Sequence, residues 1–229
     1  MKLIITCEHG GNKIPQAYAN YFDGCHSNLN SHRGYDLGAL DVYKTLVPLA
    51  DYSLFSETSR LLIELNRSTH HNNLFSEFSK KLSKAEKISL INSYYLDYRN
   101  QVENKINEWL LNDETVLHLS IHSFTPILNN KERLCDIGLL YDSKNTLEKT
   151  FCASLKKEIK SNNPLLNVRY NYPYLGTADG FTTYLRKQFH KNYMGIEIEM
   201  NQKYVQDNVF SKRLKQDLSH SISTILNTQ

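Results

Sequence analysis

The chain has 229 residues, of which 40% are hydrophobic and 22% charged, a balance typical of a globular protein that builds its own core. Its 27 lysines and arginines against 24 aspartates and glutamates give a net charge of +3, too small for a protein that binds nucleic acid by neutralising phosphates. The apolar runs are shorter than the ~18 residues of a membrane helix. We therefore expect one domain over residues 1–229, with neither nucleic acid nor membrane as a partner.

The first half of the chain predicts two strands and two helices. Residues 3–7 are an apolar run that ends in a glycine-rich loop, as a strand does. Asp36 precedes apolar residues with helical spacing over 37–47. Alternating apolar residues predict a strand at 61–65, and Ser83 and Glu86 form a capping box before a long amphipathic helix that ends near residue 109.

The second half continues the alternation of strands and helices. Strands are predicted at 115–121, 136–141, 168–171 and 193–200, and helices at 147–159, 180–189 and 210–225. This order predicts an α/β fold, a three-layer sandwich around a mostly parallel or mixed central sheet.

The cysteines indicate the redox environment. Cys7, Cys25, Cys135 and Cys152 are far apart and form no CxxC pair, so we predict four reduced thiols. The first residues resemble a strand and no signal peptide, which favours a cytoplasmic protein. A secreted protein with two disulfides is the alternative.

Three polar residues stand at the ends of predicted elements. His9 follows the first strand, His122 ends the strand that begins at 115, and Asp36 begins the first long helix. Ligands of α/β proteins collect at the carboxyl ends of strands, and two histidines with one carboxylate are a ligand set of catalytic zinc. Alternatively, the histidines bond backbone carbonyls and Asp36 is a helix N-cap.

The last predicted strand carries two carboxylates on one face. Glu197, Glu199 and Asn201 alternate with apolar residues, so they share a side. Buried carboxylates are costly unless they are paired, bind metal or have a function. An edge strand with one solvated face is the alternative.

Four arginines lie near the ends of predicted elements and could clamp a substrate carboxylate, although each alone is also typical of a surface position. They are Arg60, Arg67, Arg133 and Arg186.

Six short stretches resemble the N-formylglutamate amidohydrolase family, in order along the chain. They are CEHGGNKIP at 7–15, HRGYDLGAL at 32–40, SRLLIELNRS at 59–68, LSIHSFTP at 119–126, RLCDIGLLYD at 133–142 and YMGIEIEMNQ at 193–202.

The resemblance implies a zinc-hydrolase architecture, related to carboxypeptidases and to zinc-dependent N-acetylmuramoyl-L-alanine amidases. The positions that match the metal ligands of those amidases are His9, Asp36 and His122, and Glu199 matches their catalytic glutamate. Glu8 is an alternative acidic ligand, and Glu197 is an alternative base.

The activity implied is hydrolysis of the amide bond of an N-acyl amino acid, most simply N-formyl-L-glutamate, with Zn²⁺ as cofactor and Glu199 as the acid and base. Arg60 would stabilise the oxyanion or bind the α-carboxylate, and Asn66 and Arg67 would hold the other carboxylate, with Arg133 as a further candidate. The alternatives are a peptidoglycan amidase or carboxypeptidase, and a catalytically silent protein that binds an acidic metabolite.

Overall fold

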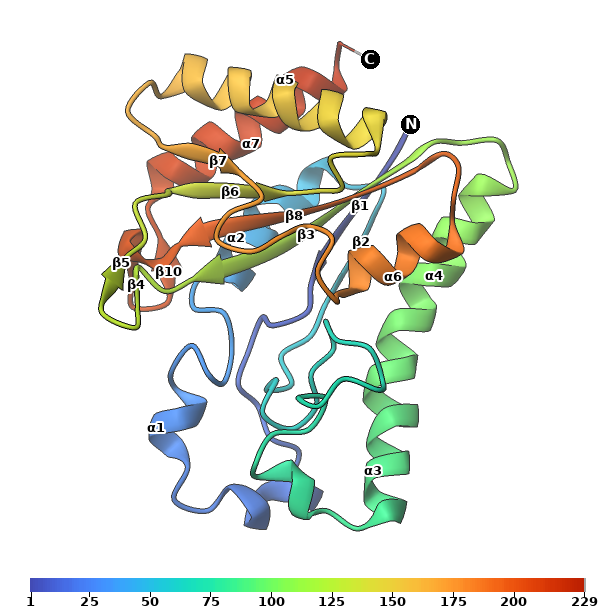
Figure 1. Ribbon diagram of the computed structural model, residues 1–229, viewed down its shortest axis with the longest axis vertical. Helices are drawn as coiled ribbons and strands as arrows, with labels where there is room; N and C mark the ends of the chain where they lie inside the picture. Colours follow the sequence, from blue (N-terminus) through green and yellow to red (C-terminus); the bar gives the residue numbers. More distant parts are fainter. Residues whose placement is uncertain (229) are drawn as a thin grey trace.

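A mixed sheet of six strands forms the centre of the computed structural model, which describes residues 1–228 (Figure 1). The strand order across the sheet is β2-β1-β3-β8-β6-β7. The bounds of these strands are Tyr52–Phe55 for β2, Lys2–Cys7 for β1, Val116–Phe124 for β3, Tyr193–Asn201 for β8, Ile137–Leu140 for β6 and Val168–Tyr170 for β7.

Strand direction brings the carboxyl ends of four strands to one edge of the sheet. Strands β2, β1, β3 and β8 are parallel, and β6 is antiparallel to β8. The register pairs His122 of β3 with Glu199 of β8. The edge where β1, β3 and β8 end is therefore the edge at which polar residues of distant sequence segments meet.

The two faces of the sheet differ in chemistry. Alternate residues of β1, β3 and β8, such as Ile5, Leu119 and Ile198, pack against α2 (Ala39–Leu46), α5 (Thr146–Asn162) and α7 (Lys212–Leu226). The opposite face is covered by α4 (Asp97–Leu110) and α6 (Phe181–Gln188) around the amino ends of the strands. These three layers confirm the predicted α/β sandwich and its mixed sheet.

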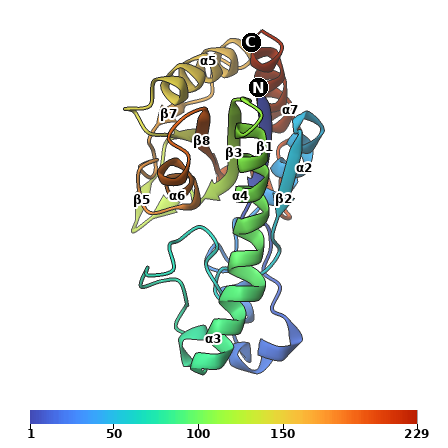
Figure 2. The same cartoon turned by 90° about the vertical axis from the view of Figure 1, so that its right-hand side faces the viewer.

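A layer of loops lies beyond the carboxyl edge of β1 and β3. It consists of residues 8–35 and 56–83 and includes the short helix α1 (His26–Leu29) and 3-10 turns at Gln16–Phe22 and Ser79–Lys81. Figure 2 shows α3 (Lys84–Leu90) and α4 running in line from this layer to the sheet. Two small hairpins complete the fold, Ile127–Leu128 with Lys131–Glu132 (β4, β5) and Val205–Gln206 with Val209–Phe210 (β9, β10).

The predicted strand at 61–65 is wrong. All five residues are buried, so the segment has no exposed alternate face. The backbone N–H of Leu62 donates to Ser59 and that of Glu64 donates to Leu74, in place of a strand ladder. The edge of the sheet next to β1 is formed by β2, which the sequence did not predict.

The other predicted elements are found with shifted ends. The capping box of Ser83 and Glu86 is confirmed, but a π-helical turn at Ile91–Leu96 interrupts the predicted long helix between α3 and α4. Helix α2 begins at Ala39 with Gly38 as its N-cap at φ 75°. Asp36 is therefore outside the helix and is not its N-cap.

Within residues 1–228, the helices are all too short or too polar to cross a membrane. The four cysteines are unpaired, as predicted, and three of them are buried. Burial raises the pKa of Cys7, Cys135 and Cys152, so these thiols are protected from reaction both sterically and electrostatically.

We expect thiol titration of the native protein to detect one readily reacting thiol, Cys25, because this cysteine alone of the four is partly exposed. Titration after denaturation without reductant should detect four. A Cys25→Ser variant is the control and should lose the fast phase. Two or fewer thiols in the denatured protein would show that a disulfide exists.

The burial of His118 predicts that the free energy of unfolding depends on pH. Its ring lies between Thr6 Oγ1 at 2.8 Å and Tyr193 Oη at 2.9 Å, and burial lowers its pKa from 6.5 to about 4. The unfolded chain therefore takes up the proton first, and the free energy of unfolding falls by about 3 kcal/mol as the pH falls from 6.5 to 4.

The measurement is urea unfolding of the wild type and His118→Gln between pH 4 and 7.5. Glutamine cannot titrate, so the wild type should lose its advantage over the variant as the pH falls. A constant difference across this range would contradict the predicted shift.

Candidate active site

Two imidazoles and one carboxylate converge at the carboxyl edge of the sheet. Asp36 Oδ2 lies 3.4 Å from Nδ1 of His9 and 3.0 Å from Nδ1 of His122. All three side chains are buried, and the three donor atoms lie within 4.8 Å of one another. The sequence placed these residues at the ends of three separate elements, and the fold brings them together.

Local backbone constraints hold this cluster in place. His9 follows β1, where Gly10 and Gly11 pass so close to Ser56 and Glu57 that a Cβ would lie 2.9 and 2.8 Å from their atoms. The backbone N–H of Asp36 donates to the carbonyl of His9 at 2.9 Å. The glycines therefore allow the approach of the two chain segments that carry His9 and Asp36.

Each histidine has a carboxylate beside its other ring nitrogen. Nε2 of His9 contacts the carboxylate of Glu64, and Nε2 of His122 lies 2.8 Å from Ser120 Oγ and 3.3 Å from Glu8 Oε2. Carboxylates in this position orient metal-ligating histidines and raise their basicity. Glu8, the alternative ligand, thus lies behind His122 and outside the cluster of donor atoms.

The second oxygen of Asp36 is held by Arg60 and lies close to His32. Oδ1 accepts from Arg60 Nη1 at 2.8 Å and lies 3.5 Å from His32 Nδ1. Burial would raise the pKa of Asp36, but Arg60 and His9 outweigh it and hold this pKa well below the usual range. The carboxylate is therefore ionised and available as a ligand.

The donor set fits a tetrahedral zinc ion. Ligand bonds of 2.0–2.1 Å place neighbouring ligand atoms about 3.3 Å apart, close to the 3.0 and 3.4 Å separations around Asp36 Oδ2. Three protein ligands leave one coordination position for water, as in catalytic sites. The residues that could hold the metal are His9, Asp36 and His122.

The two glutamates of β8 differ in their surroundings. Glu199 is buried, and its Oε2 has no hydrogen-bond partner within residues 1–228. Burial raises the pKa of Glu199 to about 8, with Asp36 and Glu197 adding to the rise and His122 opposing it. Glu197 accepts a hydrogen bond from Thr182 Oγ1 at 2.9 Å, so one of its oxygens is already bonded to α6.

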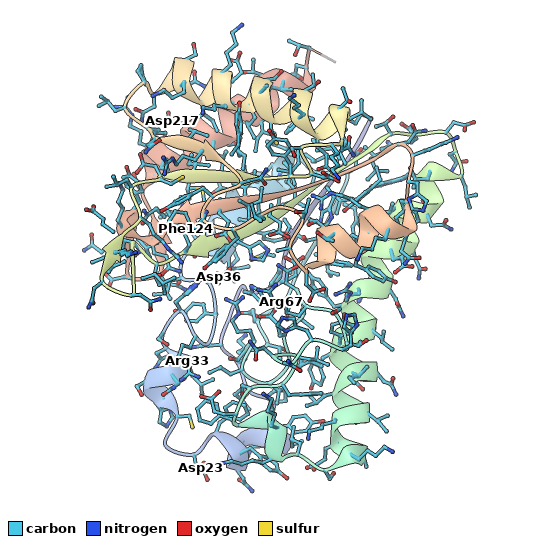
Figure 3. All side chains as sticks on the ribbon, viewed as in Figure 1. Asp23, Arg33, Asp36, Arg67, Phe124 and Asp217 are labelled. Carbon is cyan, nitrogen blue, oxygen red and sulfur yellow. The ribbon has the colours of Figure 1, made fainter. Side chains whose placement is uncertain are left out.

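A small cavity of about 160 Å³ joins these groups. Its walls include the three cluster residues, both β8 glutamates and three of the four predicted substrate-binding residues, Arg60, Asn66 and Arg67. In Figure 3, Asp36 and Arg67 lie where the sheet meets the layer of loops. Arg133, the fourth candidate, is buried beside the cavity and does not line it.

Arg60 is already engaged in two ion pairs. Its Nη1 donates to Asp36 and its Nε donates to Glu64 Oε2 at 3.0 Å. Within residues 1–228, Nη2 is the guanidinium nitrogen that takes part in neither ion pair. Arg67 donates to the backbone carbonyl of Asp179 through Nη1.

Sequence reasoning missed several residues that line or support the cavity. They are His32, Glu64, Ser123, Tyr174 and Asp179. His32 and Glu64 lie inside the stretches that carried the family resemblance, so their sequence position was a usable signal. Tyr174 belongs to the loop between β7 and α6 and has no such signal.

Comparison with known families places the chain in a class of amidohydrolases. The chain belongs to the N-formylglutamate amidohydrolase family, whose model matches residues 1–205. Among curated proteins, no sequence matches the chain.

Two solved structures have the same fold. A gene product of Agrobacterium tumefaciens is 22% identical with a TM-score of 0.76, covering 98% of this chain and 92% of the other. The N-formylglutamate amidohydrolase of Ralstonia eutropha JMP134 is 16% identical with a TM-score of 0.75, covering 100% of this chain and 93% of the other.

We predict one zinc ion per chain, and we expect the Glu64 carboxylate, which contacts Nε2 of His9, to strengthen zinc binding. Glu64→Gln should weaken zinc binding about 10- to 100-fold, because the amide binds Nε2 of His9 less strongly than a carboxylate does. Competition with a chelating dye measures this affinity. Glu77→Gln is a matched control, since Glu77 pairs with Arg33 on the surface of the same loop layer.

The double variant His9→Ala, His122→Ala should retain no stoichiometric zinc after dialysis, as measured by elemental analysis. A full equivalent of zinc in that variant would mean that the metal binds elsewhere.

Proposed function

We propose that the protein hydrolyses the amide bond of an N-acyl amino acid, with N-formyl-L-glutamate as the first substrate to test. The family supports amide hydrolysis. The observation that carries the proposal is a buried Glu199 oxygen, without a hydrogen-bond partner within residues 1–228, in the cavity of the His9, Asp36 and His122 cluster. Water would cleave the C–N bond and release formate and L-glutamate.

The proposed metal is Zn²⁺, held by His9, Asp36 and His122. When bound, zinc lowers the pKa of its water to about 7 and polarises the acyl carbonyl. Glu64 and Glu8 would keep the two imidazoles oriented, and Arg60 would keep the Asp36 carboxylate ionised and fixed.

Glu199 is proposed as the proton carrier. In its ionised form, its Oε2, which has no hydrogen-bond partner within residues 1–228, would accept the proton of the attacking water and then deliver it to the nitrogen of the leaving amine, which completes the cleavage. The strand register holds Glu199 opposite His122, so the carboxylate needs no loop movement to stay next to the cluster.

The remaining cationic groups would bind the substrate. Nη2 of Arg60 is proposed to stabilise the oxyanion that develops on the acyl oxygen. Asn66 Nδ2 lies 3.4 Å from His122 Nε2, and Arg67 follows in the chain. These two residues are therefore proposed to hold a substrate carboxylate close to the scissile bond.

Glu199→Gln should lower kcat by about 10²- to 10⁴-fold, the usual contribution of a positioned acid-base group, because glutamine cannot accept the proton. Zinc content should be unchanged, since Glu199 is not among the proposed ligands. Glu197→Gln is the matched variant on the same face of β8 and should have the smaller effect on kcat.

The assay measures formate, acetate or succinate released from a panel of N-acyl amino acids. If Glu197→Gln abolishes turnover and Glu199→Gln does not, the assignment of the base is reversed. If the zinc-loaded wild type cleaves no member of the panel, the proposed function is wrong.

A further inference from the structure

Arg133 is a buried cation, and no carboxylate within residues 1–228 pairs with it. The residue is only 7% exposed. Its hydrogen bonds are long, 3.4 Å from Nη1 to the Thr125 carbonyl, and 3.5 and 3.4 Å from Nη1 and Nη2 to Tyr174 Oη. A guanidinium removed from water in this way lacks most of the compensation that buried charges require.

Three other buried or half-buried arginines are better satisfied. Arg60 pairs with two carboxylates, and Arg186 pairs with Glu148 at 2.7 Å. Arg99 lies against three aromatic rings at 4.4–4.7 Å and donates to two backbone carbonyls at 3.1 and 3.2 Å. Arg133 lies farther from its two rings, 5.7 Å from Phe124 and 5.4 Å from Tyr174.

Tyr174 separates Arg133 from the cavity. Tyr174 lines the cavity that contains Asp36 and Glu199, whereas Arg133 lies behind it. It is 43% exposed and lies between β7 and α6, outside both elements. Rotation of this ring toward solvent would break the two long hydrogen bonds to Arg133 and the ring contact at 5.4 Å, and would open the guanidinium to the cavity.

We propose that Arg133 binds the side-chain carboxylate of the substrate, in the place that Tyr174 occupies in the free protein. This proposal rests on the proposed function and adds to it the residue that would recognise the substrate side chain and the ring that would move to admit it. The α-carboxylate is attached to the carbon next to the scissile nitrogen, so it would reach Arg67, which follows Asn66 beside His122. The side-chain carboxylate extends farther and would meet Arg133, the cation farther from the cluster.

The test compares N-formyl-L-glutamate with N-formyl-L-glutamine, which differ only in the charge and end group of the side chain. Arg133→Met should reduce the ratio of their kcat/KM values about 10- to 100-fold, the worth of a charge-assisted hydrogen bond. Arg133→Lys should retain part of the ratio, because lysine keeps the charge without the planar fork. Arg213→Met, an exposed substitution on α7, is the control and should leave the ratio unchanged.

The ratio is measured within one protein sample, so it does not depend on how much of a variant is folded. An equal loss for both substrates, or no loss, would overturn the proposal. Tyr174→Ala should lower KM for N-formyl-L-glutamate, because the guanidinium is then open without ring movement, and an increased KM for this substrate alone would contradict the proposed displacement.

Failure of the proposed function gives a different result. If the wild type hydrolyses neither amide, the test is made by binding. Calorimetry measures the binding of L-glutamate and of L-glutamine to the zinc-loaded wild type and to Arg133→Met. Weaker binding of glutamate alone in the variant would support the carboxylate subsite, and unchanged binding of both amino acids would overturn it.

Discussion

A chain of buried charges at the carboxyl edge of the sheet is the interaction on which the site depends. Arg60 joins the carboxylates of Asp36 and Glu64, and Glu64 in turn contacts His9. Asp36, Glu64 and His9 are buried and Arg60 is half-buried, so loss of Arg60 would leave two buried carboxylates without their cation, at a cost of about 3–5 kcal/mol. The layer of loops is fixed against the sheet by this chain of ion pairs as well as by its own apolar core.

The sheet provides the rigid frame for that network because of its two-residue periodicity. On β3, Leu117, Leu119 and Ile121 pack into the helical layer, while His118, Ser120 and His122 face the other side. The same alternation runs through β1 and β8. A polar row therefore crosses three parallel strands, and it can be buried because its members bond one another, as Ser120 does with Glu8 at 2.6 Å.

The features that depend on periodicity and strand ends were predictable from the sequence. Alternation along β8 placed Glu197 and Glu199 on one side, and strand ends pointed to His9 and His122. The segment at 61–65 was not predictable in the same way, because its alternating apolar residues are buried on every side by the layer of loops. Glu64, the residue of this segment that supports the site, lies among those apolar residues. Its role becomes apparent only when the fold brings it into contact with His9.

The positions of the substrate-binding candidates depend on long-range packing that no local pattern reveals. Asn66 and Arg67 lie in an irregular segment that is hydrogen-bonded to residues of α4 and α6. Arg99 donates to the carbonyls of Leu65 and Arg67, and Tyr95 Oη donates to the Arg67 carbonyl at 2.7 Å.

Helix α6 holds the same segment from its other side. The backbone N–H of Phe181, the first residue of α6, donates to Asn66 Oδ1 at 2.7 Å, and the rings of Phe181 and Tyr184 cover the Arg99 guanidinium. Aromatic faces stabilise a buried cation without neutralising it, so Arg99 keeps its charge for the two carbonyls. A segment without secondary structure thereby acquires the fixed geometry that binding groups require, and the helices that supply it are those that cover the polar face of the sheet.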